Sequence, residues 1–186
     1  MSLLEDNVDA AVATLEGLRG LRDAVDAAAE LLVRTLTGGG LVVTGGNGGS
    51  AADAMHLATE LVCRFERQRR GYPALCMNAS GGDLTAIAND FAYERVFARQ
   101  VEAFCGPGDL VVLLSTSGTS PNVRLALEEA KARGAASLTL LGRDGGAAAG
   151  LATVELCVPG TSTARIQEAH KVLIHTLCGL VEARVG

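Results

Sequence analysis

The sequence predicts an α/β fold, a three-layer α/β/α sandwich around a central parallel sheet, with additional helices at the N-terminus. Short apolar, β-branched runs alternate with segments of helical periodicity from Leu41 onward. Aromatic residues make up only 3% of the chain, whereas Ala and Gly are abundant, which suits helices packed closely against a sheet. We therefore expect one domain over residues 1–186, with N-terminal helices in 1–38 and an α/β core in 39–186.

The N-terminal segment has the apolar spacing of two helices. Val8, Val12 and Leu15 lie on one helical face, and the pattern resumes after a break near residues 17–21. Three consecutive glycines, 38–40, end the second helix. Because such a helix has few partners within a small α/β domain, we expect this segment to pack against another subunit.

The core is expected to contain five strands and the helices between them. Ser50 opens the first core helix, and Asn89 and Asp90 break the second. The strands are expected at 41–44, 73–77, 109–115, 136–141 and 154–158, and the later helices at 93–104, 121–133 and 163–184.

The first strand ends in a glycine-rich loop, in which Asn47 interrupts four glycines. Glycines permit positive φ and close approach to a ligand, and the first N–H groups of the following helix point into the same space, as in an anion site. A dinucleotide fingerprint is excluded, because Ala51 occupies the third glycine position and no acidic residue ends the next strand. A Walker A sequence is also absent, so nucleotide binding is disfavoured.

A second loop, residues 115–120, carries five hydroxyl residues and a glycine between a strand and a helix. Hydroxyls and backbone N–H groups donate to phosphate oxygens, and the helix dipole favours negative charge. The alternative is that these residues only cap the helix and form the turn. The length of the run favours the phosphate site.

The three histidines all lie on expected helices. His56 and Glu60, four residues apart, form a possible half of a metal site, as do Gln167 and His175. A packing or surface role remains open for each pair taken alone. We interpret His170 either as structural or as a residue that supports a ligand without binding the metal itself, because its spacing from His175 directs it elsewhere.

Composition argues against several other classes of function. The net charge of -5 disfavours nucleic acid as the partner, although Arg64, Arg67, Arg69 and Arg70 form a basic run. That run is either a solvated helix end or a binding patch. The five scattered cysteines suit a reducing compartment, and the sequence shows neither a leader nor a membrane span. We expect a cytoplasmic protein with no membrane partner.

The segments GNGGSAADAMHLATEL, STSGTSPNV, LGRDGG and TARIQEAHKVLIH resemble the phosphoheptose isomerases, which are sedoheptulose 7-phosphate isomerases of the sugar-isomerase (SIS) domain class. The resemblance runs from about Leu41 to Leu180. It implies a flavodoxin-like sheet, a homotetramer with active sites at subunit interfaces and one Zn²⁺ per subunit. It also implies conversion of D-sedoheptulose 7-phosphate to a D-glycero-D-manno-heptose 7-phosphate.

The resemblance assigns residues to each role. The zinc ligands would be His56, Glu60, Gln167 and His175. The substrate would contact Asn47, Gly48, Gly49, Ser50, Glu60, Arg64, Asn89, Asp90, Ser115, Thr116, Ser117, Ser120 and Gln167. Glu60 and His175 would act as base and acid through an enediol.

Two positions depart from the family pattern. Thr119 replaces the usual Asn, which alters a hydrogen bond near the phosphate, and Ala164 stands where some members carry Asp. The second departure puts an acidic substrate contact from that turn in doubt.

The alternative function belongs to a different class: a non-catalytic SIS-domain tetramer that binds a replication initiator protein. Such relatives lack the full acid, base and metal set, whereas this chain retains Glu60 and His175. A sugar-phosphate sensor within a larger regulator is disfavoured, since no DNA-binding segment is recognised.

Overall fold

The computed structural model describes residues 2–185. Its centre is a parallel sheet with strand order β2-β1-β3-β4-β5. The strands are β1 (Val42–Gly46), β2 (Ala74–Cys76), β3 (Leu110–Ser115), β4 (Ala136–Gly142) and β5 (Val154–Val158). This is the flavodoxin-like order, as expected.

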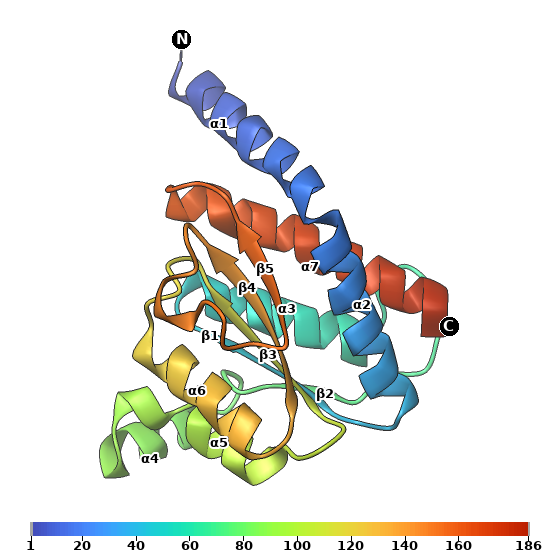
Figure 1. Cartoon of the computed structure of the whole chain (residues 1–186), viewed down its shortest axis with the longest axis vertical. Helices are drawn as coiled ribbons and strands as arrows, with labels where there is room; N and C mark the ends of the chain where they lie inside the picture. Colours follow the sequence, from blue (N-terminus) through green and yellow to red (C-terminus); the bar gives the residue numbers. More distant parts are fainter. Residues whose placement is uncertain (1, 186) are drawn as a thin grey trace.

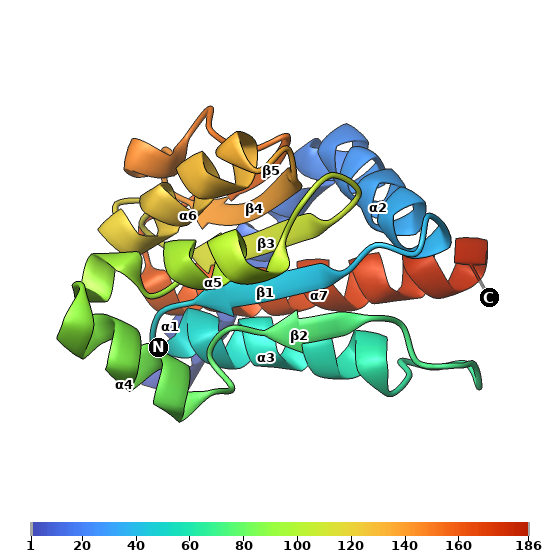
Figure 2. The ribbon, with the colours of Figure 1, turned by 90° about the horizontal axis from the view of Figure 1, so that it is seen from below.

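Helices cover both faces of the sheet (Figures 1 and 2). The α-helices are α1 (Leu3–Gly17), α2 (Arg22–Thr37), α3 (Gly49–Val62), α4 (Gly81–Asp90), α5 (Ala98–Phe104), α6 (Pro121–Ala132) and α7 (Thr163–Val185). The 3-10 helices are η1 (Leu18–Leu21), η2 (Tyr93–Arg95) and η3 (Gly146–Ala148).

Alternation along β3 divides the core into two layers. Leu110, Val112 and Leu114 pack with α2, α3 and α7, whereas Val111 and Leu113 pack with α5 and α6. Every residue of β3 is buried, which explains why Leu110 to Leu114 form a continuous apolar run. The three-layer α/β/α sandwich predicted from the sequence is confirmed.

Two expectations about helices need correction. The helix expected at 93–104 is two elements, η2 and α5, and the chain between them is not helical. Asn89 and Asp90 do not break α4 but are its last two residues. Both differences concern where a helix ends, which apolar periodicity determines poorly.

The N-terminal helices occupy the positions expected of them, with η1 at the predicted break. Helix α1 begins with a capping box, in which Ser2 Oγ accepts from the Glu5 N–H and the Glu5 carboxylate accepts from the Ser2 N–H. No residue of α1 is buried, and the helix extends beyond the sandwich (Figure 1). Both N-terminal helices contact α7, and α2 is the one that buries side chains in the core.

Among residues 2–185, no helix combines the length and apolar character needed to cross a bilayer.

Candidate active site

The two loops singled out in the sequence follow β1 and β3, which are neighbours in the sheet. The helix after β1, α3, lies on one face, and the helix after β3, α6, lies on the other. In such a sheet, ligands bind beyond the carboxyl ends of strands where the connections diverge in this way. The fold therefore brings both candidate anion-binding loops to one crevice.

The first loop is organised around Asn47. Its Nδ2 donates to Asn122 Oδ1 at 2.8 Å, and its Oδ1 accepts from Asn122 Nδ2 at 2.9 Å and from the Tyr93 hydroxyl at 3.1 Å. Because Asn122 lies in the first turn of α6, this pair of amides joins the two loops directly. Gly48 has φ +57, as expected of a glycine there, and Ser50 is buried in the first turn of α3.

The second loop uses some of its hydroxyls internally and leaves others free. Ser115 Oγ accepts from the Gly118 N–H at 3.0 Å, while the hydroxyls of Ser117 and Thr119 lie 3.0 Å apart. Ser120 is the N-cap of α6, yet its side chain makes no capping hydrogen bond. The purely structural alternative, helix capping, is therefore not what this hydroxyl does. Together with the α6 N–H groups, Ser120 offers donors to an anion.

Three candidate metal and catalytic side chains converge between α3 and α7. His56 Nε2 lies 3.0 Å from His175 Nε2 and 3.5 Å from Glu60 Oε1. All three groups are reachable from solvent: the side chains of His56 and Glu60 are 34% and 20% exposed, and His175 is itself exposed. The structure thus brings together residues 119 positions apart in the chain.

The surroundings of His56 lower the pKa of its imidazole and so favour the neutral form. Burial lowers the pKa of His56, and the Lys171 ammonium lowers it further, against an opposing effect of Glu60. Lys171 is held at 2.8 Å from Asp53, on the same side of α3 as His56. A neutral imidazole can bind a cation, because its lone pair is free.

The separations of His56 from Glu60 and His175 are close to those between the ligands of a zinc ion. Zinc bound at about 2.0–2.1 Å by tetrahedral ligands separates the ligand atoms by roughly 3.3 Å, and the two distances from His56 lie on either side of that value. Gln167, the fourth expected ligand, lies on α7 with its amide against Gly49; a Cβ on Gly49 would stand 2.0 Å from Gln167 Nε2. Within residues 2–185, no cluster of three or more His, Cys, Asp or Glu meets the criteria for a metal site. The donor types and the two distances from His56 fit zinc, and Gln167 would have to supply the fourth ligand.

The remaining expected residues are placed as follows. Asn89 and Asp90 are exposed at the end of α4, where Asn89 Nδ2 donates to Asp90 Oδ1 at 2.8 Å. Arg64 is exposed in the loop after α3 and donates to the Phe65 carbonyl at 3.3 Å. Thr116 is partly buried next to Ser115. His170 is fully buried and bonded to the Leu141 carbonyl, which agrees with a structural role.

Sequence reasoning missed several residues of this crevice. Tyr93 and Asn122 fix Asn47, and the Phe65 ring stacks on His175 with centroids 5.5 Å apart at 28°. Asn122 could have been found, because it ends the hydroxyl-rich segment STSGTSPN. Tyr93 and Phe65 carried no signal, since each lies far in sequence from the residue that it contacts.

Comparison with known proteins identifies the family. A SIS domain model matches residues 7–142, which is more than half of the chain. The phosphoheptose isomerase of Citrifermentans bemidjiense is 48% identical over 162 residues, covering 87% of this chain and 84% of the relative. That of Pelobacter propionicus is 50% identical over 157 residues, covering 84% and 82%.

The chain belongs to the phosphoheptose isomerase family of SIS-domain proteins. As a member of this family it is an isomerase.

Solved structures agree with this assignment. A phosphoheptose isomerase from Neisseria gonorrhoeae has a TM-score of 0.89 and 37% identity, covering 97% of this chain and 99% of that one. One from Francisella tularensis has a TM-score of 0.93 and 31% identity, covering 98% and 100%. The five-stranded parallel sheet and the N-terminal helices are thus shared with these isomerases.

Proposed function

We propose that this isomerase converts D-sedoheptulose 7-phosphate to D-glycero-D-manno-heptose 7-phosphate. The observation that carries the proposal is the meeting of His56, Glu60 and His175 on α3 and α7, with α3 beginning at the first candidate anion-binding loop. The names of the relatives supply the substrate class, a heptose phosphate. A phosphorylated sugar needs both an anion site and groups for proton transfer, and the two kinds of group are the candidate loops and the His56–Glu60–His175 cluster.

Glu60 and His175 are proposed to carry the proton transfers. The reaction removes a proton from the carbon next to the ketose carbonyl and gives an enediol, which takes up a proton at the former carbonyl carbon. We assign the base to Glu60 and the acid that serves the sugar oxygens to His175. Both groups lie within 3.5 Å of His56 Nε2, which supports their acting on the same part of the substrate.

A zinc ion, one per subunit, is proposed to be held by His56, Glu60, Gln167 and His175. Such an ion would supply Lewis-acid stabilisation of the charge that develops on the sugar oxygens. A cation also lowers the basicity of a carboxylate bound to it, so Glu60 is the weaker base while it binds metal. Glu60 would therefore serve as the base when it is free of the metal, or its role toward the metal would be partly structural.

The substrate phosphate is assigned to the second loop. Ser115, Thr116, Ser117 and Ser120 carry the hydroxyls, and the free Ser120 side chain supports this placement. Asn47, Gly48, Gly49 and Ser50 are assigned to the sugar. The other proposed substrate residues are Arg64, Asn89, Asp90 and Gln167.

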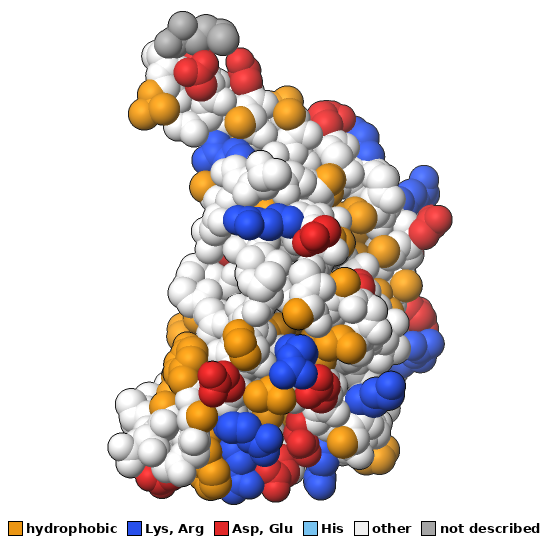
Figure 3. Space-filling model, turned by 60° about the vertical axis from the view of Figure 1, so that its left-hand side comes forward, with side chains coloured by type: hydrophobic (Ala, Val, Ile, Leu, Met, Phe, Trp, Pro, Cys, Tyr) orange, Lys and Arg blue, Asp and Glu red, His pale blue; other side chains and the backbone are white. Residues whose placement is uncertain are grey.

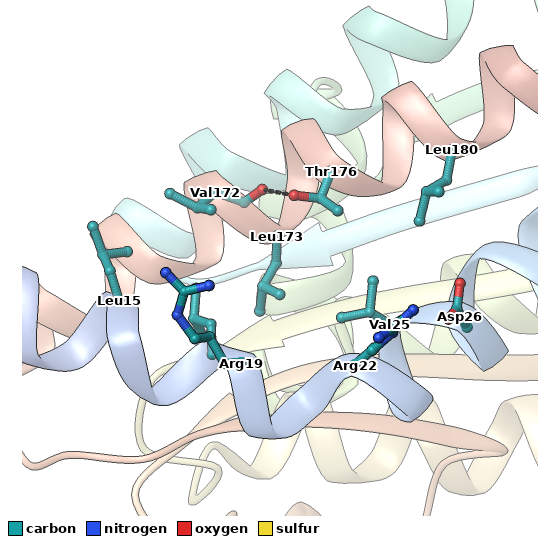
Figure 4. Close-up of a pocket in the computed structure, with 10 residues that line it drawn as sticks. Leu15, Arg19, Arg22, Val25, Asp26, Val172, Leu173, Thr176 and Leu180 are labelled. Carbon is teal, nitrogen blue, oxygen red and sulfur yellow. Dashed lines mark hydrogen bonds between the residues drawn. The ribbon is translucent and has the colours of Figure 1, made fainter.

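We propose a homotetramer, with the N-terminal helices in the interfaces. Leu4, Val8 and Val12 form an exposed apolar stripe along α1, at 72%, 51% and 54% exposure. Figure 3 shows α1 as a narrow projection that carries apolar side chains. A groove of about 720 Å³ runs between the N-terminal helices α1 and α2 on one side and α7 on the other. It is lined by Leu15, Val25, Val172, Leu173 and Leu180 (Figure 4).

The five unpaired cysteines support a reducing, cytoplasmic location.

Substitution of the base tests the function. Glu60→Gln is expected to lower kcat on sedoheptulose 7-phosphate by about 10³-fold or more. A loss of this order is expected when a general base is removed. Glu128→Gln removes an exposed carboxylate paired with Arg124 on α6, away from the crevice, and should leave kcat unchanged. Both variants should keep the oligomeric state of the wild type.

Turnover of the Glu60→Gln variant at the wild-type rate would rule out the assignment of the base. A folded, metal-bound wild-type protein with no isomerase activity would instead favour the non-catalytic tetramer that binds a replication initiator protein.

A further inference from the structure

Glu182 is a carboxylate buried near the C-terminal end of α7. Its side chain is only 3% exposed and accepts the backbone N–H groups of Phe65, Glu66 and Arg67 at 2.8–2.9 Å. Arg69 Nε donates a fourth hydrogen bond at 2.9 Å. Four donors on one buried carboxylate fix the path of the loop that follows α3.

Arg69 extends these contacts to α3. Its Nη2 donates to the Glu60 carbonyl at 2.7 Å and its Nη1 to the Leu61 carbonyl at 2.9 Å. These carbonyls belong to the last turn of α3, where helix carbonyls lack partners within the helix. The guanidinium also lies 4.0 Å from the centre of the Tyr72 ring. Arg69 and Glu182 therefore join the end of α3 to α7.

Both ends of this connection reach the proposed active site. Glu182 holds the backbone of Phe65, and the Phe65 ring stacks on His175. Arg69 holds the carbonyl of Glu60 itself. Because Glu182 follows His175 by seven residues, about two helical turns, both side chains lie on one face of α7.

Stability alone is a weak reason for such a pair. Burying two charges costs desolvation free energy that their attraction recovers only in part. Here Glu182 binds the loop that carries Phe65, whose ring lies against His175. Arg69 binds the last turn of α3, which contains Glu60. Partners of this kind orient the groups that act on a metal or substrate.

We propose that Arg69 and Glu182 are positioning residues, which hold Phe65 against His175 and fix the last turn of α3 at Glu60. The pair thereby maintains the spacing among His56, Glu60 and His175. The inference rests on the proposed function for the roles of those three residues. Its geometric consequence, the contact of Phe65 with His175, is measurable without turnover.

The test compares Glu182→Gln with the wild type. The amide keeps the size of the carboxylate but turns N–H groups toward the backbone N–H donors, so the loop should shift. Two experiments are made. Steady-state kinetics on sedoheptulose 7-phosphate give kcat and KM, and NMR gives the ring-proton resonance of His175, which is assigned by its loss in His175→Gln. We expect kcat to fall about 10–100-fold with little change in KM. The His175 resonance should move toward its position in Phe65→Leu, because the ring current of Phe65 is displaced.

Arg184→Gln is the matched control. It breaks an exposed ion pair with Asp26 two residues further along α7, at 3.1 Å, without touching the loop. This variant should leave kcat and the His175 resonance unchanged.

A Glu182→Gln protein that melts earlier yet keeps the wild-type kcat and His175 resonance would overturn the proposal, since the pair would then be structural only. Should Glu182→Gln fail to fold, Phe65→Leu decides, because it leaves the ion pair intact. A wild-type kcat in that variant would refute positioning through Phe65, and a loss of kcat would support it. If the wild type does not isomerise the sugar phosphate, the proposed function fails, and the His175 resonance alone still tests the contact.

Discussion

Asn47 is the residue at which the two loops of the crevice meet. Asn122 and Tyr93 together saturate its side-chain oxygen, and one N–H of its Nδ2 is used by Asn122. The second N–H remains available to a ligand. The orientation of Asn47 therefore depends on residues that do not themselves have to touch the substrate.

Removal of the Tyr93 hydroxyl tests this dependence. Tyr93→Phe deletes one hydrogen bond to Asn47, a loss of roughly 0.5–1.5 kcal/mol, so kcat/KM should fall about 2- to 12-fold. Stability should change little, because Tyr93 is 59% exposed.

The other tyrosine provides the control. The Tyr72 hydroxyl is buried and has no hydrogen-bond partner among the described residues, so Tyr72→Phe should leave kcat/KM unchanged and keep or raise the melting temperature. Unchanged kinetics in Tyr93→Phe would show that Asn47 is fixed without the hydroxyl.

At the scale of elements, the Glu182 carboxylate binds three backbone N–H groups of the loop between α3 and β2, together with Arg69. Burial alone would raise the pKa of Glu182, but three backbone N–H groups and Arg69 lower it from 4.5 to about 2. The folded protein therefore holds this proton less tightly than the unfolded chain does. The stabilisation is complete above about pH 4.5 and is lost as the pH falls toward 2.

Unfolding by urea at a series of pH values measures this contribution. The difference in unfolding free energy between the wild type and Glu182→Gln should be largest near neutral pH and should shrink as the pH falls from about 4.5 toward 2. The comparison cancels the other carboxylates, which titrate in both proteins. A difference that is constant across this range would contradict the lowered pKa.

Much of the element pattern could be predicted from sequence. Residues 110–114 are all apolar because β3 is buried on both faces, and the break at 17–21 coincides with η1. Helix ends were less certain, because they depend on backbone geometry: residues 93–104 have a helical pattern but form η2 and α5. The sites where strand, glycine loop and helix meet were the strongest signals.

The contacts around the site could be predicted only in part. Sequence spacing placed His56 and Glu60 on one face of α3, but only the fold brings His175 to within 3.0 Å of His56. The basic run after α3 was interpreted as a solvated helix end or a binding patch. Neither interpretation describes Arg69, which is buried against Glu182 more than a hundred residues away in the sequence. Long-range pairs of this kind leave no local pattern.

At the scale of the whole molecule, the projecting helix α1 leaves Leu4, Val8 and Val12 more than half exposed within residues 2–185. Val8→Glu with Val12→Glu places two carboxylates on this stripe. If the stripe is buried between subunits, the dissociation constant of the oligomer should rise about 100-fold or more, because burying an unpaired charge costs several kcal/mol. Sedimentation over a range of protein concentrations measures the change.

Ala10→Glu is the control for the oligomer, since residue 10 lies on the opposite side of α1 and is exposed. An oligomer that is equally stable in the double variant and the wild type would exclude this stripe from the interface.

The central claim is that folding gathers His56, Glu60, Gln167 and His175 into one site that isomerises a heptose phosphate. The most direct test follows sedoheptulose 7-phosphate labelled with ¹³C at the ketose carbon by NMR, with purified protein of known metal content. The account predicts that this signal is replaced by that of an aldose C2, that the conversion stops when a chelator removes the metal, and that added zinc restores it. A folded, zinc-loaded protein that leaves the ketose signal unchanged would contradict the account.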